Sequence, residues 1–273
     1  MGDWLFLVVL WSFTAGVVLM GLFGLTDRRV NQWSIRFGVL VEDSIRPQVR
    51  QRLWRARAIR WIAFAIGLNV GMLPMYWNVI DAERAGDFAN DLTSIAPVGA
   101  AVLGSLFAEI ALVQRPRGSL VAATTTRRWS DYIDRFWLVF IAGCVPVAAI
   151  ATWVGPASPG GGGRWLWVAP VMCVVALAAV TIGIRVVVDR PAGADSDRML
   201  RIDDALRADG IHHIVGGAVA LAGLSAAQAV NRAIPPSLLT VVLALLNLVF
   251  LAVWITIATS SRWNVDAARL QHR

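Results

Sequence analysis

Long apolar runs alternate along this chain with shorter polar segments, and the runs predict its fold. Each is about 20 residues long, enough for a helix rising ~1.5 Å per residue to cross a hydrocarbon core of ~30 Å. The seven runs cover residues 4–25, 61–80, 95–114, 136–155, 165–186, 211–230 and 238–259. The sequence therefore predicts an all-α, polytopic membrane helix bundle with seven transmembrane helices in one integral membrane domain, residues 1–273. The sixth run is the weakest, because glycines and alanines lower its hydrophobicity.

The polar segments between the runs differ sharply in arginine content. With the N-terminus outside, the cytoplasmic segments are 26–60, 115–135, 185–210 and 260–273. These segments hold 22 of the arginines, and the outer segments hold 3. Cytoplasmic loops of membrane proteins carry an excess of basic residues. We therefore expect an outside N-terminus, a cytoplasmic C-terminus and a location in the bacterial plasma membrane.

Composition agrees with a membrane protein and excludes two kinds of site. The chain is 57% hydrophobic and 16% charged, with a mean hydropathy of +0.62, whereas soluble domains are about a quarter charged. It has 25 arginines and no lysine. A Walker A phosphate-binding loop and a Schiff base both require lysine, so neither is expected.

The sequence offers no recognisable catalytic or metal-binding motif. Cys144 and Cys173 both fall in apolar runs, where cysteine acts as a small apolar residue. His212, His213 and His272 are too few and too scattered for a zinc site. Catalytic Ser/His or Asp/Asp pairs and the HExxH pattern are not recognisable. We expect no enzymatic activity, no metal and no cofactor.

An arginine-rich segment, residues 44–60, precedes the second run. Ser44 and Pro47 are suited to a helix start, and apolar residues recur among the arginines. The candidate docking residues are Arg50, Arg52, Trp54, Arg55 and Arg57. We expect a helix on the inner leaflet that is attracted to anionic lipid and leads into the second span. The alternative is a docking surface for a soluble protein; nucleic acid is not expected, since the membrane already supplies an anionic neighbour.

Two arginine-proline turns suggest an internal repeat. Val113-Gln-Arg-Pro-Arg-Gly118 is followed 75 residues later by Val188-Asp-Arg-Pro-Ala-Gly193. Their turn residues are Arg115, Pro116, Arg117, Arg190 and Pro191, all expected at the cytoplasmic face. Each turn lies between two apolar runs, so residues 95–155 and 165–230 would form parallel copies, as occur in some transporters.

Two charged residues fall well inside the apolar runs. Glu109 precedes Arg115 by six residues, and Arg185 precedes Arg190 by five. A buried charge in lipid usually finds a partner or a water-filled cavity. Their similar depth predicts that Glu109 and Arg185 form an ion pair. The alternative is that Arg185 extends to the lipid phosphates, while Glu109 is protonated or bonds a serine.

The chain resembles a group of actinobacterial integral membrane proteins of uncharacterised function. The resemblance is carried by Ala108-Glu109, Arg115-Pro-Arg-Gly118, Arg127-Arg128 with Asp131-Tyr132, Asp203-Asp204-Ala-Leu-Arg207, Arg36-Phe-Gly-Val39 and Arg52-Leu-x-Arg-x-Arg-Ala58. This resemblance covers most of the chain and implies a companion of other membrane or regulatory systems. Arg190-Pro-Ala-Gly departs from the full Arg-Pro-Arg turn.

These features favour a non-enzymatic membrane subunit that assembles with a protein partner, such as a transport complex, through its arginine-rich inner face. Two alternatives stay open. One is a transporter or channel with Glu109 and Arg185 in its path, and the other is a membrane sensor of a small ligand.

Overall fold

The computed structural model describes residues 2–23, 26–76, 82–112, 128–154, 167–190, 197–233 and 238–260. In these ranges the chain is helical and forms no strand, which confirms the expected all-α class. The helices are α1 (Gly2–Phe23), α2 (Asp27–Phe37), α3 (Arg46–Tyr76), α4 (Ala82–Ala111), the short 3-10 helix η1 (Trp129–Asp131), α5 (Arg135–Val154), α6 (Val168–Val188), α7 (Asp197–Ala233) and α8 (Leu238–Ala258).

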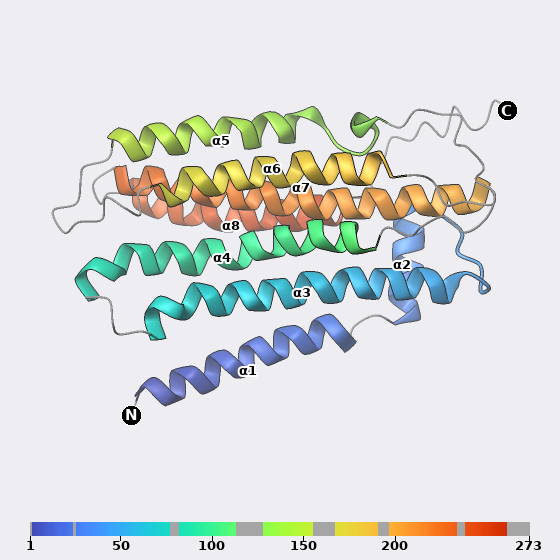
Figure 1. Ribbon diagram of the computed structural model, residues 1–273, viewed down its shortest axis with the longest axis horizontal. Helices are drawn as coiled ribbons and strands as arrows, with labels where there is room; N and C mark the ends of the chain where they lie inside the picture. Colours follow the sequence, from blue (N-terminus) through green and yellow to red (C-terminus); the bar gives the residue numbers. More distant parts are fainter. Residues whose placement is uncertain are drawn as a thin grey trace.

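Seven long helices overlap the seven apolar runs, and they alternate in direction along one bundle (Figure 1). Within the described residues, four stretches are long and apolar enough to cross a membrane. They are Leu92–Ala111, Arg135–Val154, Val168–Val188 and Arg198–Ala233. Shorter apolar stretches lie in α1 (Trp11–Phe23) and α8 (Leu245–Ala258).

Helix α7 is the core of the bundle, although its run has the weakest hydrophobicity. It packs against α4, α5, α6 and α8, and almost every residue from Ala205 to Ala227 is buried. Its glycines allow close approach: a Cβ at Gly217 would lie 2.8 Å from Val102, and one at Gly223 would lie 2.6 Å from Phe250. A helix surrounded by protein needs small residues more than lipid-soluble ones, which explains its low hydrophobicity.

Helices α3 and α4 make the most extensive contact between any two of the described helices. A Cβ at Gly67 would lie 2.4 Å from the carbonyl oxygen of Ala96, and one at Gly104 would lie 2.4 Å from Ala63. Small residues thus let the two backbones touch. Helix α1 packs along α3 at the edge of the bundle (Figure 1). Its large side chains, such as Trp11 and Phe13, are exposed.

A short helix, α2, lies across the end of the bundle where the arginines gather (Figure 1). Val30, Trp33 and Phe37 recur every three or four residues and are buried, so this helix presents one apolar face to the bundle. Gly38 ends it in the left-handed conformation at φ 62°, with its N–H donating to Ile35. This is a common helix end that glycine favours.

The two halves of the expected repeat pack differently. Helix α6 packs along α7, whereas α4 packs mainly on α3 and α7. The short helix η1 precedes α5, while the corresponding polar segment before the sixth run is already part of the 37-residue α7. The helices of residues 95–155 and 165–230 therefore do not pack on corresponding neighbours, and the repeat stays a prediction from the sequence.

Candidate functional site: a buried charge cluster

The acid Glu109 lies in the last turn of α4, which ends at Ala111. Its side chain is 4% exposed. A carboxylate at a helix C-terminus is unfavourable because the backbone dipole is negative there, and burial adds a desolvation cost. Compensating cations must therefore surround Glu109.

Three arginines from two other parts of the chain supply this positive charge. Arg52 Nη2 lies 3.8 Å from Glu109 Oε2, and Arg60 Nη2 lies 3.6 Å from Glu109 Oε1; both come from α3. Arg190, which follows α6, places Nη1 3.7 Å from Glu109 Oε2. One carboxylate thus joins α3, α4 and the end of α6.

Helix α7 approaches the same point through a glycine. A Cβ on Gly210 would lie 2.5 Å from the carboxyl carbon of Glu109. The residue before Gly210, Asp209, forms two ion pairs. One is with Arg60, at 3.6 Å, and the other is with Arg36 of α2, at 3.9 Å. Arg60 therefore bridges Glu109 and Asp209, and α2 joins the cluster.

The other side of the cluster is centred on Arg207, which is fully buried. It binds Asp203 through Nε at 2.9 Å and Nη2 at 2.8 Å. Its Nη1 donates to the carbonyl oxygens of Val187 and Arg190, both at 2.7 Å. The Val187 carbonyl lies in the last turn of α6, where it has no partner within the helix, and Arg190 follows that end by two residues. Arg207 therefore caps α6 from α7.

Asp203 also accepts a hydrogen bond from Arg190 Nη2 at 2.8 Å. Arg190 is therefore shared between Asp203 and Glu109. Burial and the nearby charge of Arg52 lower the pKa of the Arg190 guanidinium, while the two carboxylates oppose this shift. Since arginine begins from a pKa far above neutrality, Arg190 stays positively charged.

The cluster is close to neutral in total. It contains five arginines (Arg36, Arg52, Arg60, Arg190 and Arg207) and four carboxylates (Glu109, Asp203, Asp204 and Asp209). Mutual pairing is what buried charges require.

The contacts to Glu109 are longer than hydrogen bonds, and within the described chain its Oε2 has no hydrogen-bond partner.

Two neighbouring histidines of α7 border the cluster and point to different faces of the helix. The Nε2 atom of His212 lies 3.0 Å from the carbonyl oxygen of Tyr132, and its ring stacks on Phe37 at 6.4 Å. The Nδ1 atom of His213 lies 2.8 Å from the carbonyl oxygen of Asp209. His212 therefore connects α7 to α2 and to the segment after η1.

The predicted pair of Glu109 with Arg185 is wrong. Among the described residues, the cations within 4 Å of Glu109 are Arg52, Arg60 and Arg190, and Arg185 is exposed. Arg190 lies two residues beyond the end of α6 and occupies the place beside Glu109 that was expected for Arg185. The prediction rested on the similar depth of Glu109 and Arg185 in their two runs. Depth along a helix does not show which face of the helix a side chain occupies.

The structure also divides the candidate docking residues. Arg52 is 9% exposed and belongs to the cluster, so its expected place on a lipid-facing surface is wrong. Arg50, Trp54 and Arg55 are exposed, and Arg57 is half-buried. Helix α3 continues without a break from Arg46 to Tyr76, which confirms that the basic segment leads directly into the second run. The segment runs along the bundle (Figure 1), so the expected separate helix lying on the inner leaflet is wrong.

Of the predicted cytoplasmic turn residues, the structure describes only Arg190. It is buried in the cluster instead of facing lipid headgroups. Arg115, Pro116, Arg117 and Pro191 lie outside the described residues.

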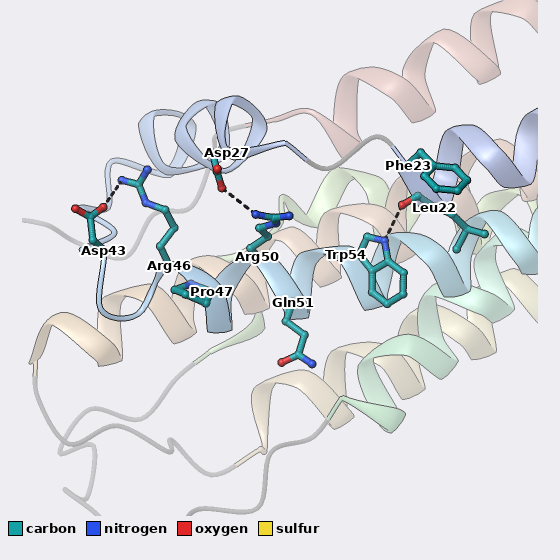
Figure 2. Close-up of a pocket in the computed structure, with 9 residues that line it drawn as sticks. All are labelled: Leu22, Phe23, Asp27, Asp43, Arg46, Pro47, Arg50, Gln51 and Trp54. Atoms are coloured by element: carbon teal, nitrogen blue, oxygen red, sulfur yellow. Dashed lines mark hydrogen bonds and ion pairs between the residues drawn. The ribbon is translucent and has the colours of Figure 1, made fainter.

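Near the cluster, a hollow of about 760 Å³ lies between the end of α1, the start of α2 and the first turns of α3 (Figure 2). It is lined by Leu22, Phe23, Asp27, Asp43, Arg46, Pro47, Arg50, Gln51 and Trp54. Trp54 Nε1 donates to the carbonyl oxygen of Leu22 at 2.7 Å, which ties α3 to the end of α1.

Among the described residues, no group of three or more His, Cys, Asp or Glu side chains is arranged to hold a metal ion. Comparisons with family models, curated proteins and solved structures found no match for this chain. The cluster, the basic end of the bundle and the hollow therefore carry the functional inference.

Proposed function

We propose that this chain is a non-enzymatic, seven-span protein of the bacterial plasma membrane that serves as an accessory subunit of a membrane complex, such as a transport system. Its N-terminus lies outside and its C-terminus in the cytoplasm. The seven alternating helices support the seven spans, and the gathering of arginines at one end supports this orientation.

The observation that carries the subunit role is the tying of helix ends by the buried charge cluster. Arg207 holds the end of α6, Arg36 donates to Ala258 and Ser260 at the end of α8, and Glu109 holds α4 against α3. A bundle fixed at its cytoplasmic end suits a scaffold that presents a constant surface to a partner.

The basic residues outside the cluster supply that surface. Exposed arginines include Arg28, Arg29, Arg55, Arg128, Arg135, Arg198 and Arg201. Arginine is enriched in protein interfaces because its planar head binds carboxylates with two hydrogen bonds. We expect an acidic surface on the partner.

Purification from the native membrane in mild detergent tests this role. The expected result is a partner recovered at constant stoichiometry, identified by mass spectrometry. That partner should be lost when Arg198 and Arg201 are changed together to glutamine. A chain recovered repeatedly alone, with its fold intact, would contradict the subunit role.

One observation favours a transporter as the second candidate. Glu109 Oε2 is buried and has no hydrogen-bond partner among the described residues, as would suit a carboxylate that gains and loses a proton. Proton flux into liposomes that is abolished by Glu109→Gln, but not by Glu42→Gln, would favour this candidate. Glu42 is an exposed carboxylate paired with Arg198.

A further inference from the structure

The hollow between α1, α2 and α3 changes character along its length. At one end lie the apolar side chains of Leu22, Phe23 and Trp54, and at the other lie the pairs Arg46–Asp43 and Arg50–Asp27 (Figure 2). Phe23 is 79% exposed although it ends an apolar helix. The apolar end is continuous with the outward side chains of α1, so it opens onto the surface that lipid would cover.

The spacing of the two ends matches the edge of a bilayer. Arg46, Arg50 and Trp54 follow one another at four-residue intervals along one side of α3, so Arg50 lies roughly 6 Å beyond Trp54 along the helix. The headgroup layer on each side of a bilayer is about 5–7 Å thick. Trp54 bonds to Leu22, at the inner end of the first apolar run, 4–25. With that end of α1 at the hydrocarbon boundary, Arg50 is at the depth of lipid phosphates, and α3 enters the hydrocarbon before its own apolar run begins.

The two arginines can accept an anion because their present partners are weakly held. Arg50 is 3.3 Å from Asp27, with side chains 53% and 61% exposed, and the side chain of Asp43 is 96% exposed. Exposed pairs of this kind contribute only about 0–1 kcal/mol. A phosphate can displace them, since it binds guanidinium groups through two strong hydrogen bonds.

Further basic residues belong to α2 and α3, two of the helices that line the hollow. Arg28, Arg29 and Arg55 are exposed. Burial, and after it the nearby charge of Arg29, lowers the pKa of Arg57. The charge of Arg29 on α2 thus acts on Arg57 of α3.

We propose that this hollow binds one anionic phospholipid, with its phosphate on Arg46 and Arg50 and its acyl chains along Phe23 and Trp54. The proposal rests on the membrane orientation proposed above but not on a protein partner. A soluble phosphate would leave the apolar end uncovered, whereas a phospholipid occupies both ends. The bound lipid would also fill the seam between α1 and α3.

Native mass spectrometry of the detergent-purified protein tests the site. Phosphatidylglycerol and phosphatidylcholine are titrated separately, and the occupancy of the first bound lipid is measured. We expect phosphatidylglycerol to bind more tightly. The double variant Arg46→Gln/Arg50→Gln should weaken its binding about 10–30-fold, from about 1 kcal/mol for each arginine near anionic lipid. Equal binding of both lipids would overturn the proposal.

The matched control is Arg128→Gln/Arg135→Gln, which removes the same charge from exposed positions before and at the start of α5. It should leave the first phosphatidylglycerol site unchanged, and an equal loss in both double variants would mean nonspecific attraction and overturn the site. Inorganic phosphate at the same concentration should not displace the lipid; displacement would mean a phosphate site without an acyl part. If the protein binds the lipid as expected but no protein partner is recovered on purification, the subunit role is contradicted and the lipid site is not.

A third variant tests the apolar end. Trp54→Ala should shorten lipid residence and weaken phosphatidylglycerol binding at least 3-fold, while Trp167→Ala, an exposed tryptophan at the start of α6, should not. No difference between these two variants would overturn the assigned position of the acyl chains. The thermal unfolding midpoint of each variant confirms that the compared proteins are folded.

Discussion

Gly210 of α7 faces the carboxylate of Glu109 so closely that an added Cβ would lie 2.5 Å from its carboxyl carbon. Three arginines hold that carboxylate, so it has little freedom to move away. Gly210→Ala should therefore displace part of the cluster and lower the free energy of unfolding by about 1–3 kcal/mol. Unfolding in mixed micelles measures the change.

Gly143 provides the control for this substitution. It lies within α5 with nothing within 4 Å of its added Cβ, so Gly143→Ala should be neutral or stabilising by up to about 1 kcal/mol. Glu109→Asp shortens the side chain and moves the carboxylate away from residue 210. In a double-mutant cycle, the loss of unfolding free energy caused by Gly210→Ala should therefore be smaller in the Glu109→Asp background. Independent, additive effects would contradict the assigned contact.

Neutralising Glu109 should be costly because it leaves positive charges facing one another. Glu109→Gln keeps the side-chain size but removes the anion shared by Arg52, Arg60 and Arg190. Breaking a buried ion pair typically costs about 3–5 kcal/mol. Glu42→Gln removes an exposed carboxylate and should cost less than about 1 kcal/mol. Equal unfolding midpoints for the two variants would rule out a stabilising cluster.

Arg207 should be irreplaceable, even by lysine. Its guanidinium binds Asp203 and two carbonyl oxygens at the end of α6 at the same time, and an ammonium group lacks this planar fork. We expect Arg207→Lys to lower the unfolding free energy by about 2 kcal/mol and Arg207→Met by about 3–5 kcal/mol. Arg201→Lys, at an exposed position of the same helix, is the control. A lysine variant as stable as the unmodified protein would show that the fork is unnecessary.

Cysteine labelling in intact cells and inverted vesicles tests the orientation. Arg201→Cys should react with a membrane-impermeant maleimide only in inverted vesicles, and Trp167→Cys only from outside the cell. Both residues are exposed, and the start of α7 and the start of α6 lie at opposite ends of the bundle (Figure 1). Cys144 and Cys173 are buried and should contribute little background. The reverse pattern would overturn the assigned topology.

The sequence predicted the position of every long helix, because an apolar run of membrane length leaves few alternatives to a helix. It also predicted that residues 44–60 are helical and lead into the second run, but it did not predict that the polar segments before the second and sixth runs have buried sides. Residues 46–60 and 197–210 are polar, yet they continue α3 and α7 because their buried sides face other helices. Hydropathy averages over both sides of a helix and misses this.

The short helix α2 could have been found from the sequence. Its signals are Thr26-Asp27 at the start, the spacing of Val30, Trp33 and Phe37, and Gly38 at the end. The partners of Glu109 could not have been found in this way. Two of them, Arg52 and Arg60, fall in a segment that reads as a solvent-facing basic helix, and only the tertiary packing brings them to α4.

Arg36 donates to the carbonyl oxygen of Ser260, which follows it by 224 residues. A ribosome adding about 5–20 residues per second needs roughly 11–45 s to synthesise that interval. During this time Arg36 and the buried face of α2 lack their final neighbours in α7 and α8. This end of the bundle therefore reaches its native contacts only after α8 has been synthesised, so a chain truncated before α8 should be exposed to quality-control proteases.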